Sequence, residues 1–450
     1  MAMTILRFIL ISLLMPLSIV MAAPIVVLLK TEEQPAPLYF VIDNDGSYTK
    51  SYVDEMRKIA RFDFDHNSKT SVAPTTQELD QLALKEAFKE QKHLKTWQDK
   101  GIELVVVFLI KEGKLEVEVI EPSTKKIKAV HAISLTGKVD EDRKKFHTLA
   151  DTILENFFQI QGIAGSRIAF TDKRRINANK EVAEVWESDY DGANLTQLTK
   201  ENALCVTPIY LPSDKDKKSH LLCYVSYKTG QPKLKMVNLQ NGISQPLIRL
   251  RGQQMMPSFS PQRDSIAFIS DLTGNPDLFL VDLDENLKPE SKPRQIYGTR
   301  YSTQGSPTFS PDGKQIAFVS NKDGKPRIYT MAVPAPTAKI EQITPTLISK
   351  RPVEASAPAW SPDGTKIAYC AKTGDYRQIY VYELSTGKEI QITTGSSHKE
   401  NPCWAKNSVH LLYNAGNEAS TNIFLVDIIQ KKPVQITQGK NQKRFPAWRN

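Results

Sequence analysis

The side chains that could act as acids, bases or nucleophiles lack the spacing of known catalytic motifs. Asp312 and Asp363 occupy equivalent points in two copies of Ser-Pro-Asp-Gly, and paired carboxylates can serve as general acid and base. Each precedes a glycine in a turn signal, where a carboxylate bonds to the local backbone. The sequence holds no Gly-x-Ser-x-Gly turn and no His-Glu-x-x-His pair among its histidines. We therefore predict no catalytic, metal-binding or cofactor-binding residues; the histidines are His66, His93, His131, His147, His220, His398 and His410.

These turns belong to a motif that recurs along the C-terminal two-thirds of the chain. A proline and an aromatic residue are often followed by Ser-Pro-Asp-Gly and an apolar segment, as in Ala357-Pro358-Ala359-Trp360. The copies recur about every 44 to 51 residues, a period typical of propeller blades. Each repeat has room for four antiparallel strands, which is one blade. The copies begin at 207, 256, 306, 357, 401 and 445.

The order of the strands predicts six blades closed into a ring. Apolar strands at 167–170 and 184–186 precede the first proline motif, whereas the last motif, 445–448, has no strand after it. The C-terminal strand should therefore complete the first blade and remove the free edges of the ring. The predicted fold is an all-β six-bladed β-propeller preceded by a small α+β domain. The predicted segments are 1–22 (signal peptide), 23–37 (tail), 38–162 (α+β domain) and 163–450 (propeller).

The N-terminal third has the pattern of an export signal followed by mixed helices and strands. Arg7, an apolar run over 8–21 and Ala22-Ala23 predict a cleaved secretory signal. An uncleaved anchor is the alternative, although Pro16 and Pro24 disfavour a continuous spanning helix. Beyond it we expect strands at 38–42, 102–110, 115–119 and 126–133. We expect helices at 52–60, at 79–88 with Thr75 and Glu78 as a capping box, and at 140–158.

Charge and cysteine content limit the partners. The formal net charge is +9, but the basic residues are scattered and no nucleic-acid-binding module accompanies them. In an exported protein, short runs of basic residues such as Lys173-Arg174-Arg175 form solvated faces or contact acidic surfaces. The cysteines are Cys205, Cys223, Cys370 and Cys403. Cys205 and Cys223 fall on neighbouring strands, so either a disulfide there or buried free thiols fit the pattern.

Several strings resemble the TolB family of the Tol-Pal envelope system. These are Gly-Ser-Arg-Ile-Ala-Phe at 165–170, Ser-Asp-Tyr-Asp-Gly at 188–192, the closing Phe-Pro-Ala-Trp, and the glycine-led apolar strand at 101–107. The resemblance covers nearly all of the mature chain. It implies a monomeric, non-catalytic periplasmic adaptor without a cofactor. Its propeller mouth would bind the peptidoglycan-associated lipoprotein Pal, and its N-terminal region would contact the inner-membrane protein TolA.

In that family the Pal-contacting residues lie in loops just before the inner-strand prolines. The matching positions here are Gln254, Met255, Met256, Gln304, Ser306, Ser356, Lys399, Glu400, Lys443 and Arg444. Adjacent exposed methionines suit an adaptable protein-binding surface, so Met255 and Met256 are the strongest candidates. The TolA contact would involve the tail at Ile25, Val26, Val27 and Leu28, whose sequence departs from the family motif.

Two other interpretations compete with the adaptor. Similar repeats occur in propeller-type hydrolases, which carry a separate catalytic domain with a serine nucleophile turn. A propeller could also bind peptidoglycan or another envelope glycan or lipid directly, because Trp360, Trp404 and Trp448 could stack on sugars if exposed. Their fixed place in the inner strand predicts packing between blades instead. No nucleic acid and no stable membrane insertion are expected after signal cleavage.

Overall fold

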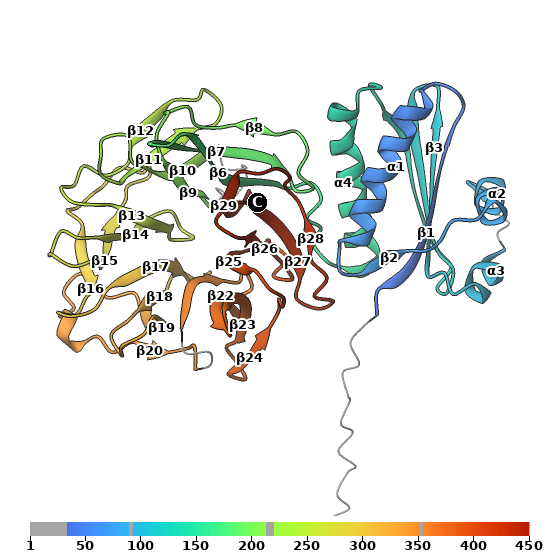
Figure 1. Ribbon diagram of the computed structural model, residues 1–450. Coiled ribbons are helices and arrows are strands. Elements are labelled where there is room, and N and C mark those ends of the chain that lie inside the picture. The colour runs from blue at the N-terminus through green and yellow to red at the C-terminus, as the bar shows by residue number, and fades with distance from the viewer. Residues whose placement is uncertain (1–33, 90–92, 213–219, 351–353, 450) are drawn as a thin grey trace, which may run out of the picture. The chain divides into compact units, whose positions relative to one another are not determined.

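The computed structural model describes residues 34–89, 93–212, 220–350 and 354–449. It comprises an α+β part and a larger all-β part that is built from repeated four-stranded sheets (Figure 1). The predicted signal peptide, most of the predicted tail and the charged segment at 214–218 lie outside the described residues. Within these ranges no helix is long and apolar enough to cross a membrane.

The α+β part contains a five-stranded sheet in the order β2-β1-β3-β4-β5. Side chains of β1 and β3 are buried on both faces, because Phe40 and Phe108 pack in one cluster while Tyr39 and Val105 pack in another. Helices α1 and α4 cover one face, and α2 and α3 lie at the other (Figure 1). The strands are β1 (Ala36–Asn44), β2 (Thr70–Val72), β3 (Leu104–Lys111), β4 (Lys114–Glu121) and β5 (Lys126–Ser134); the helices are α1 (Lys50–Asp65), α2 (Gln77–Glu86), α3 (Leu94–Asp99) and α4 (Val139–Phe158).

The predicted start of the second helix was wrong by one residue. Thr76, not Thr75, is the N-cap of α2, and its hydroxyl accepts a hydrogen bond from the Leu79 amide at 3.3 Å. The helix also ends at Glu86, before Phe88, whose φ of 58° is incompatible with a right-handed helix. Two short elements, β2 and α3, were not predicted from the sequence.

The all-β part forms six blades. Blades 2 to 5 are separate four-stranded sheets, and blades 1 and 6 belong to one larger sheet that includes the C-terminal strand. Blade 1 is β29-β6-β7-β8, and blades 2 to 6 are β9 to β12, β13 to β16, β17 to β20, β21 to β24, and β25 to β28.

The bounds of these strands follow the repeats. Blade 1 contains β6 (Arg167–Asn177), β7 (Lys180–Asp189), β8 (Thr196–Gln197) and β29 (Gln442–Arg449). Blades 2 and 3 contain β9 (Cys205–Tyr210), β10 (Leu221–Ser226), β11 (Lys233–Asn238), β12 (Ser244–Pro246), β13 (Met255–Phe259), β14 (Ser265–Ser270), β15 (Asp277–Asp282) and β16 (Arg294–Tyr297). Blades 4 to 6 contain β17 (Gln304–Phe309), β18 (Gln315–Ser320), β19 (Arg327–Ala332), β20 (Thr346–Leu347), β21 (Ala355–Trp360), β22 (Lys366–Thr373), β23 (Tyr376–Glu383), β24 (Lys388–Gln391), β25 (His398–Trp404), β26 (His410–Gly416), β27 (Thr421–Asp427) and β28 (Val434–Gln435), with a 3-10 turn at Ile340–Gln342.

The C-terminal strand supplies the inner strand of blade 1. β29 pairs antiparallel with β6 from Gln442 opposite Lys173 to Arg449 opposite Arg167. β29 also pairs with β27 of blade 6, at Gln442 opposite Thr421. The first and last parts of the propeller are thus joined by a ladder of hydrogen bonds, as ring closure requires. The domain boundaries near 37 and 162 remain predictions.

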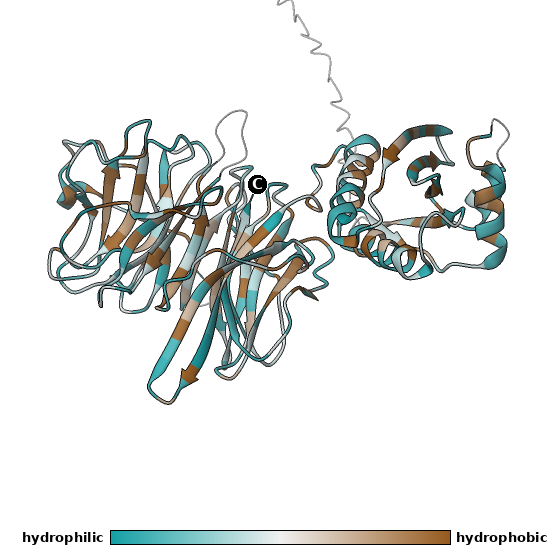
Figure 2. Ribbon diagram, turned by 90° about the horizontal axis from the view of Figure 1, so that it is seen from above, coloured by the Kyte–Doolittle hydropathy of each residue, from teal (hydrophilic) through white to brown (hydrophobic). Residues whose placement is uncertain are grey.

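Tryptophans of the inner strands tie neighbouring blades together. Trp404 and Trp448 are buried, and their indole N–H groups donate to the carbonyl oxygens of Ala359 and Cys403, each in the preceding blade, at 3.0 and 3.2 Å. Trp360 is half-buried, and its N–H donates to its own turn at Gly364. Apolar residues concentrate in the strands and polar residues in the loops (Figure 2). The predicted packing role of Trp404 and Trp448 is therefore confirmed.

The cysteines of blade 2 are free thiols. Cys205 lies opposite Ser226, and Cys223 lies opposite Ile209, so the two cysteines are not cross-strand neighbours. They also pack in different apolar clusters. Of the two alternatives that the sequence left open, buried free thiols is the one observed. Cys403 of blade 6 is also a free thiol. Burial raises the pKa of Cys403 to about 11, so its thiol is protonated at neutral pH.

Candidate binding site at the propeller mouth

Each inner strand carries a bulge at its proline. The register with the second strand shifts across this point in all six blades. Proline cannot donate to a strand ladder, so a bulge is where a sheet accommodates it. The residue before the proline has a left-handed backbone every time: Thr207 (φ 49°), Met256 (51°), Ser306 (44°), Ala357 (51°), Asn401 (55°) and Phe445 (56°).

These bulges surround a cavity of about 310 Å³, the mouth cavity. All six inner-strand prolines and all six residues before them line it. Blades 2 and 3 add further apolar and aromatic side chains. The walls are therefore mainly apolar, with hydroxyl and amide groups at Thr207, Ser306 and Asn401; the added side chains are Val206, Ile209, Val225, Tyr227 and Met255.

Three of the predicted contact residues, Met255, Met256 and Ser306, line the mouth cavity. Met256 is 40% exposed, whereas Met255 is half-buried, so the expected pair of exposed methionines is one exposed residue and one partly covered. The Met256 sulfur accepts a hydrogen bond from the Ser306 amide at 3.1 Å. This bond holds neighbouring inner strands in a fixed relation at the rim of the cavity.

Four other predicted residues have buried side chains that support the loops. The Gln254 amide nitrogen donates to the carbonyl oxygens of Ile248 and Leu250, both at 3.3 Å, and Gln304 donates to the Ser302 hydroxyl at 2.9 Å. Lys399 donates to the Ser397 carbonyl oxygen at 3.0 Å, and burial lowers its pKa. Lys443 lies 3.9 Å from Asp172. Contact between these four and a partner stays a prediction.

The remaining three predicted residues are half-buried. The Ser356 hydroxyl lies 3.1 Å from the Cys370 sulfur, Glu400 pairs with Arg377 at 3.1 Å, and the buried Nε of Arg444 has no hydrogen-bond partner among the described residues. The tail residues Ile25, Val26, Val27 and Leu28 lie outside the described residues. Four residues that line the cavity were not among the predicted contact residues: Thr207, Ala357, Asn401 and Phe445. Each directly precedes an inner-strand proline, which is the signal in the sequence that would have found them.

The Ser-Pro-Asp-Gly turns lie at the opposite end of the inner strands. Asp312 accepts a bond from the Lys314 amide at 3.0 Å, and Asp363 accepts one from the Thr365 amide at 3.0 Å. Partial burial favours the neutral acid, but bonds from Lys366 and Ser361 outweigh it and hold the pKa of Asp363 at about 2. Local bonding of both carboxylates is confirmed. A second cavity of about 380 Å³ opens here, and Trp360 and Trp448 help to line it.

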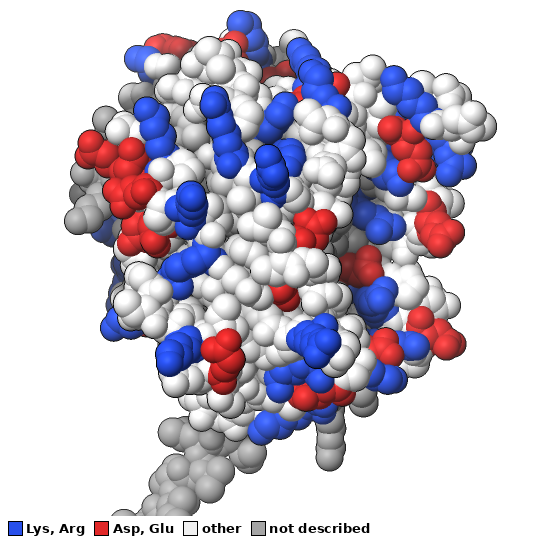
Figure 3. All heavy atoms as spheres, turned by 90° about the vertical axis from the view of Figure 1, so that its left-hand side faces the viewer, with Lys and Arg blue, Asp and Glu red and all other residues white. Residues whose placement is uncertain are grey.

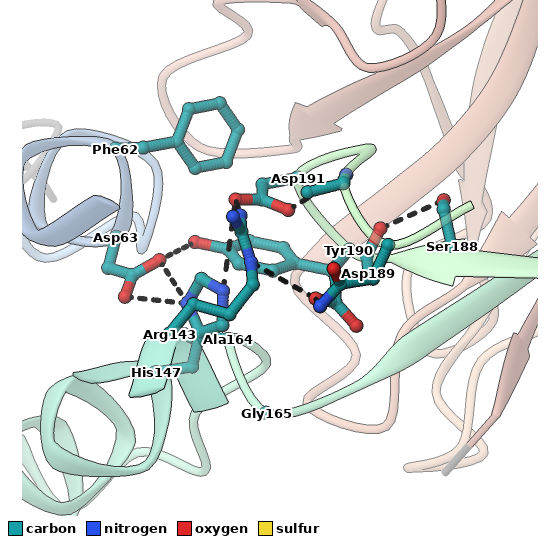
Figure 4. A network of polar contacts seen from close by, with 12 residues as sticks. Phe62, Asp63, Arg143, His147, Ala164, Gly165, Ser188, Asp189, Tyr190 and Asp191 are labelled. Atoms are coloured by element: carbon teal, nitrogen blue, oxygen red, sulfur yellow. Dashed lines mark hydrogen bonds and ion pairs between the residues drawn. The ribbon is translucent and has the colours of Figure 1, made fainter. Parts of the chain in front are cut away.

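A buried polar network links α1 and α4 to the loop after β7 (Figure 4). The Asp63 carboxylate lies 2.8 Å from Nδ1 of His147 and accepts a hydrogen bond from the Tyr190 hydroxyl at 2.5 Å. All three side chains are buried. Gly192 follows in the same loop with a φ of +92°, and a Cβ there would lie 2.2 Å from the Ile436 carbonyl oxygen. The Ser-Asp-Tyr-Asp-Gly string thus encodes a contact between the two parts of the chain.

Two aspartates extend this network. Ligand atoms of His147, Asp189 and Asp191 lie within 4.8 Å of one another, as in a metal site. However, Arg143 pairs with both aspartates, and Arg167 pairs with Asp189 at 2.7 Å. With His147 protonated, the three carboxylates of Asp63, Asp189 and Asp191 face three cations. The negative charge of these carboxylates is thus already balanced by side-chain cations, which disfavours the binding of a divalent metal ion here.

We expect this network to make stability depend on pH. Burial alone would lower the pKa of His147, but the Asp63 carboxylate outweighs burial and raises it. A raised pKa means that the stabilisation is complete below about pH 6.5, the unfolded value, and is lost as the pH rises through the folded value. The urea midpoint of the wild type should therefore exceed that of His147→Gln by more at pH 6 than at pH 9. A difference that stays constant over this range would contradict the prediction.

The chain is similar to known proteins over most of its length. The family model "TolB beta propeller domain" matches residues 154–450. A TolB homologue of Protochlamydia amoebophila is 44% identical over 383 residues, which are 84% of this chain and 81% of that protein. A TolB homologue of Chlamydia abortus is 42% identical over 272 residues, 60% of this chain and 62% of its own.

A solved structure supports the same arrangement at the level of the fold. The crystal structure of TolB from Acinetobacter baumannii matches with a TM-score of 0.75 over 93% of this chain and 97% of that one, at 19% identity. The match spans both the α+β part and the propeller described above. Together with the match of the family model and the identity to the curated relative, it leads to one conclusion: this chain belongs to the TolB family.

Proposed function

We propose that this protein is a non-catalytic periplasmic adaptor of the Tol-Pal envelope system. Its propeller mouth binds the lipoprotein Pal and its N-terminal region binds TolA, which supports outer-membrane integrity and envelope constriction at cell division. The observation that carries this proposal is the mouth cavity, an apolar depression ringed by six proline bulges. Membership of the TolB family supports it.

The mouth has the composition of a protein-binding surface. Interfaces between proteins combine an apolar centre, enriched in aromatic residues and methionine, with a polar rim. Here Tyr227, Met255 and Met256 line the apolar cavity, and the loops around it are polar. The volume of about 310 Å³ suits one or a few side chains of a partner.

The residues that could do chemistry support an adaptor over a hydrolase. Asp312 and Asp363 are committed to their own turns. Cys205, Cys223 and Cys370 are buried, and burial raises their pKa, so their thiols are poor nucleophiles. The network of Asp63, His147 and Tyr190 is buried, and the Asp63 carboxylate is engaged by both the His147 ring and the Tyr190 hydroxyl.

Calorimetric titration with the soluble domain of Pal from the same organism tests the adaptor. The wild type should bind one-to-one, and Met256→Glu should weaken binding at least tenfold, because a carboxylate would replace the exposed apolar side chain at the rim of the cavity. Lys399, another of the predicted contact residues, is not a suitable second position for this test. Its side chain is buried and donates to the Ser397 carbonyl oxygen of its own loop, so Lys399→Glu would disturb the fold as well as any contact.

The matched control is Ile243→Glu. Ile243 is 63% exposed at the turn between β11 and β12, at the end of the blade away from the mouth. This variant should bind Pal as the wild type does. Equal loss in both variants would move the site away from the mouth. A wild type that binds isolated glycan strands but not Pal would support direct glycan binding, for which Trp360 at the second cavity is the candidate.

A further inference from the structure

The two faces of the propeller differ in charge. Strands alternate in direction within a blade, so two kinds of connection emerge at the face that holds the mouth cavity: the one before each inner strand and the one between the second and third strands. This is the mouth face. Exposed cations occur there around the ring, including Arg174, Lys228, Arg251, Arg300, Lys372 and Lys440.

These six cations are not neutralised within the part of the chain that the structure describes. Other basic residues of the mouth face do have acidic partners: Lys325 pairs with Glu354 at 3.2 Å and Arg377 with Glu400 at 3.1 Å. None of the six forms such an ion pair with a described residue. Three acidic residues of this face, Glu354, Glu400 and Asp323, pair with lysine or arginine. Asp375 and Glu418 are exposed on the same face and form no ion pair with a described residue.

The opposite face carries both signs. Its connections hold Asp284, Glu285 and Glu290 beside Lys288 and Lys292. Figure 3 looks at the outer rim, where Asp and Glu gather at the left edge and Lys and Arg spread over the upper half. Exposed cations without an acidic partner therefore recur around the mouth face, whereas this connection of the opposite face carries both signs.

We infer that the protein which docks at the mouth presents an acidic surface around an apolar anchor, and that this charge steers its approach. The inference rests on the proposed function, since it names the chemistry of the partner at the same site. A protein fits better than an anionic polymer because the centre of the mouth is apolar: proline, methionine and tyrosine side chains line the cavity. The six cations do not line it; Arg174 and Lys372 lie on β6 and β22, and the other four lie in loops.

Steering of this kind acts on the rate of association. Charges at the rim raise the association rate constant and its salt dependence, while contacts at the centre control dissociation. At an ionic strength of 0.15 M the Debye length is about 8 Å, so cations spread around the ring act on a partner that is already near the surface. The association rate constant should therefore fall steeply as salt is added.

Stopped-flow association with the soluble Pal domain tests the inference, at 20, 150 and 500 mM NaCl. The double variant Lys228→Glu with Lys372→Glu reverses two cations of the mouth face that do not line the cavity. Its association rate constant should fall at least tenfold at 20 mM salt and approach the wild-type value at 500 mM. The dissociation rate constant should change little.

The matched control, Lys314→Glu with Lys388→Glu, makes the same change in net charge on the opposite face, where both lysines are exposed. Its association rate constant should stay within about twofold of the wild-type value, because salt screens charges that are far from the docking partner. Equal slowing in both double variants would overturn the inference, as would a wild-type rate that does not depend on salt. Either result leaves the proposed function intact as long as Pal binds.

A second arm separates the two proposals. If Pal does not bind, the proposed function fails, and immobilised heparin becomes the anionic probe. The double variant of the mouth face should then elute at lower salt than the control, and equal elution would overturn the charge asymmetry. Tight retention on heparin together with salt-independent association of Pal would overturn the assignment to a protein and favour an anionic polymer.

Discussion

Asp63→Ala should lower the free energy of unfolding by about 3 to 5 kcal/mol, the cost typical of breaking a buried ion pair. The substitution removes the acceptor for both the His147 ring and the Tyr190 hydroxyl, which lie 84 and 127 residues away along the chain. Burial raises the pKa of Tyr190, so its hydroxyl stays protonated and would be left without an acceptor. Urea denaturation followed by circular dichroism at pH 7 measures the loss.

Two variants complete this experiment. Asp63→Asn keeps a side-chain oxygen as acceptor but removes the charge, so its loss should fall between zero and that of Asp63→Ala. Glu141→Gln removes an exposed ion pair with Lys138 and should leave the urea midpoint unchanged. If Asp63→Ala were as stable as Glu141→Gln, the network would have no structural role.

Removal of residues 442–450 should abolish the single cooperative unfolding transition of the propeller. This truncation takes away β29, so β6 loses its pairing partner and the Cys403 carbonyl loses the bond from Trp448. Inner faces of blades 1 and 6 would be exposed, because Trp448 packs with Ile168 and Leu412 in one apolar cluster. Differential scanning calorimetry should show a broadened transition at lower temperature.

The point variant Trp448→Phe is the control for this truncation. It keeps a large apolar ring in the cluster but loses the indole N–H, so it should cost about 1 to 3 kcal/mol, the range for leaving a buried acceptor without a partner. Its transition should remain single. A truncated chain with a wild-type transition would mean that the ladder between β29 and β6 is not needed for closure.

The repeated motif predicted the propeller because each of its parts determines the structure of only the few residues around it. The proline marks a bulge, the Asp-Gly pair marks the turn, and the apolar triplet marks a strand that is buried on both faces. Ile367, Ala368 and Tyr369 are accordingly among the most buried residues of the chain. Short elements were not predicted, because the three residues of β2 and the six residues of α3 are too few to show a hydrophobic period.

The candidate site could be predicted in position but not in detail. The residues before the inner-strand prolines line the cavity, but they belong to the inner strands and not to loops, as had been expected. Whether a side chain of these strands faces the cavity depends on the bulge, and contact with a partner stays a prediction. Gln254 is fully buried, whereas Met256, two residues later, is 40% exposed. The network of Asp63, His147 and Tyr190 gave no signal in the sequence, because tertiary packing alone brings those residues together.

The six left-handed residues of the inner strands also affect how the mouth responds to a partner. Such conformations are unfavourable in isolation and persist only where the surrounding structure fixes them. The rim of the cavity is thus ordered when the chain folds, and little backbone entropy remains to be lost on binding. The mouth should keep the same backbone in its free and occupied states, so that differences in affinity between partners come from the partners themselves.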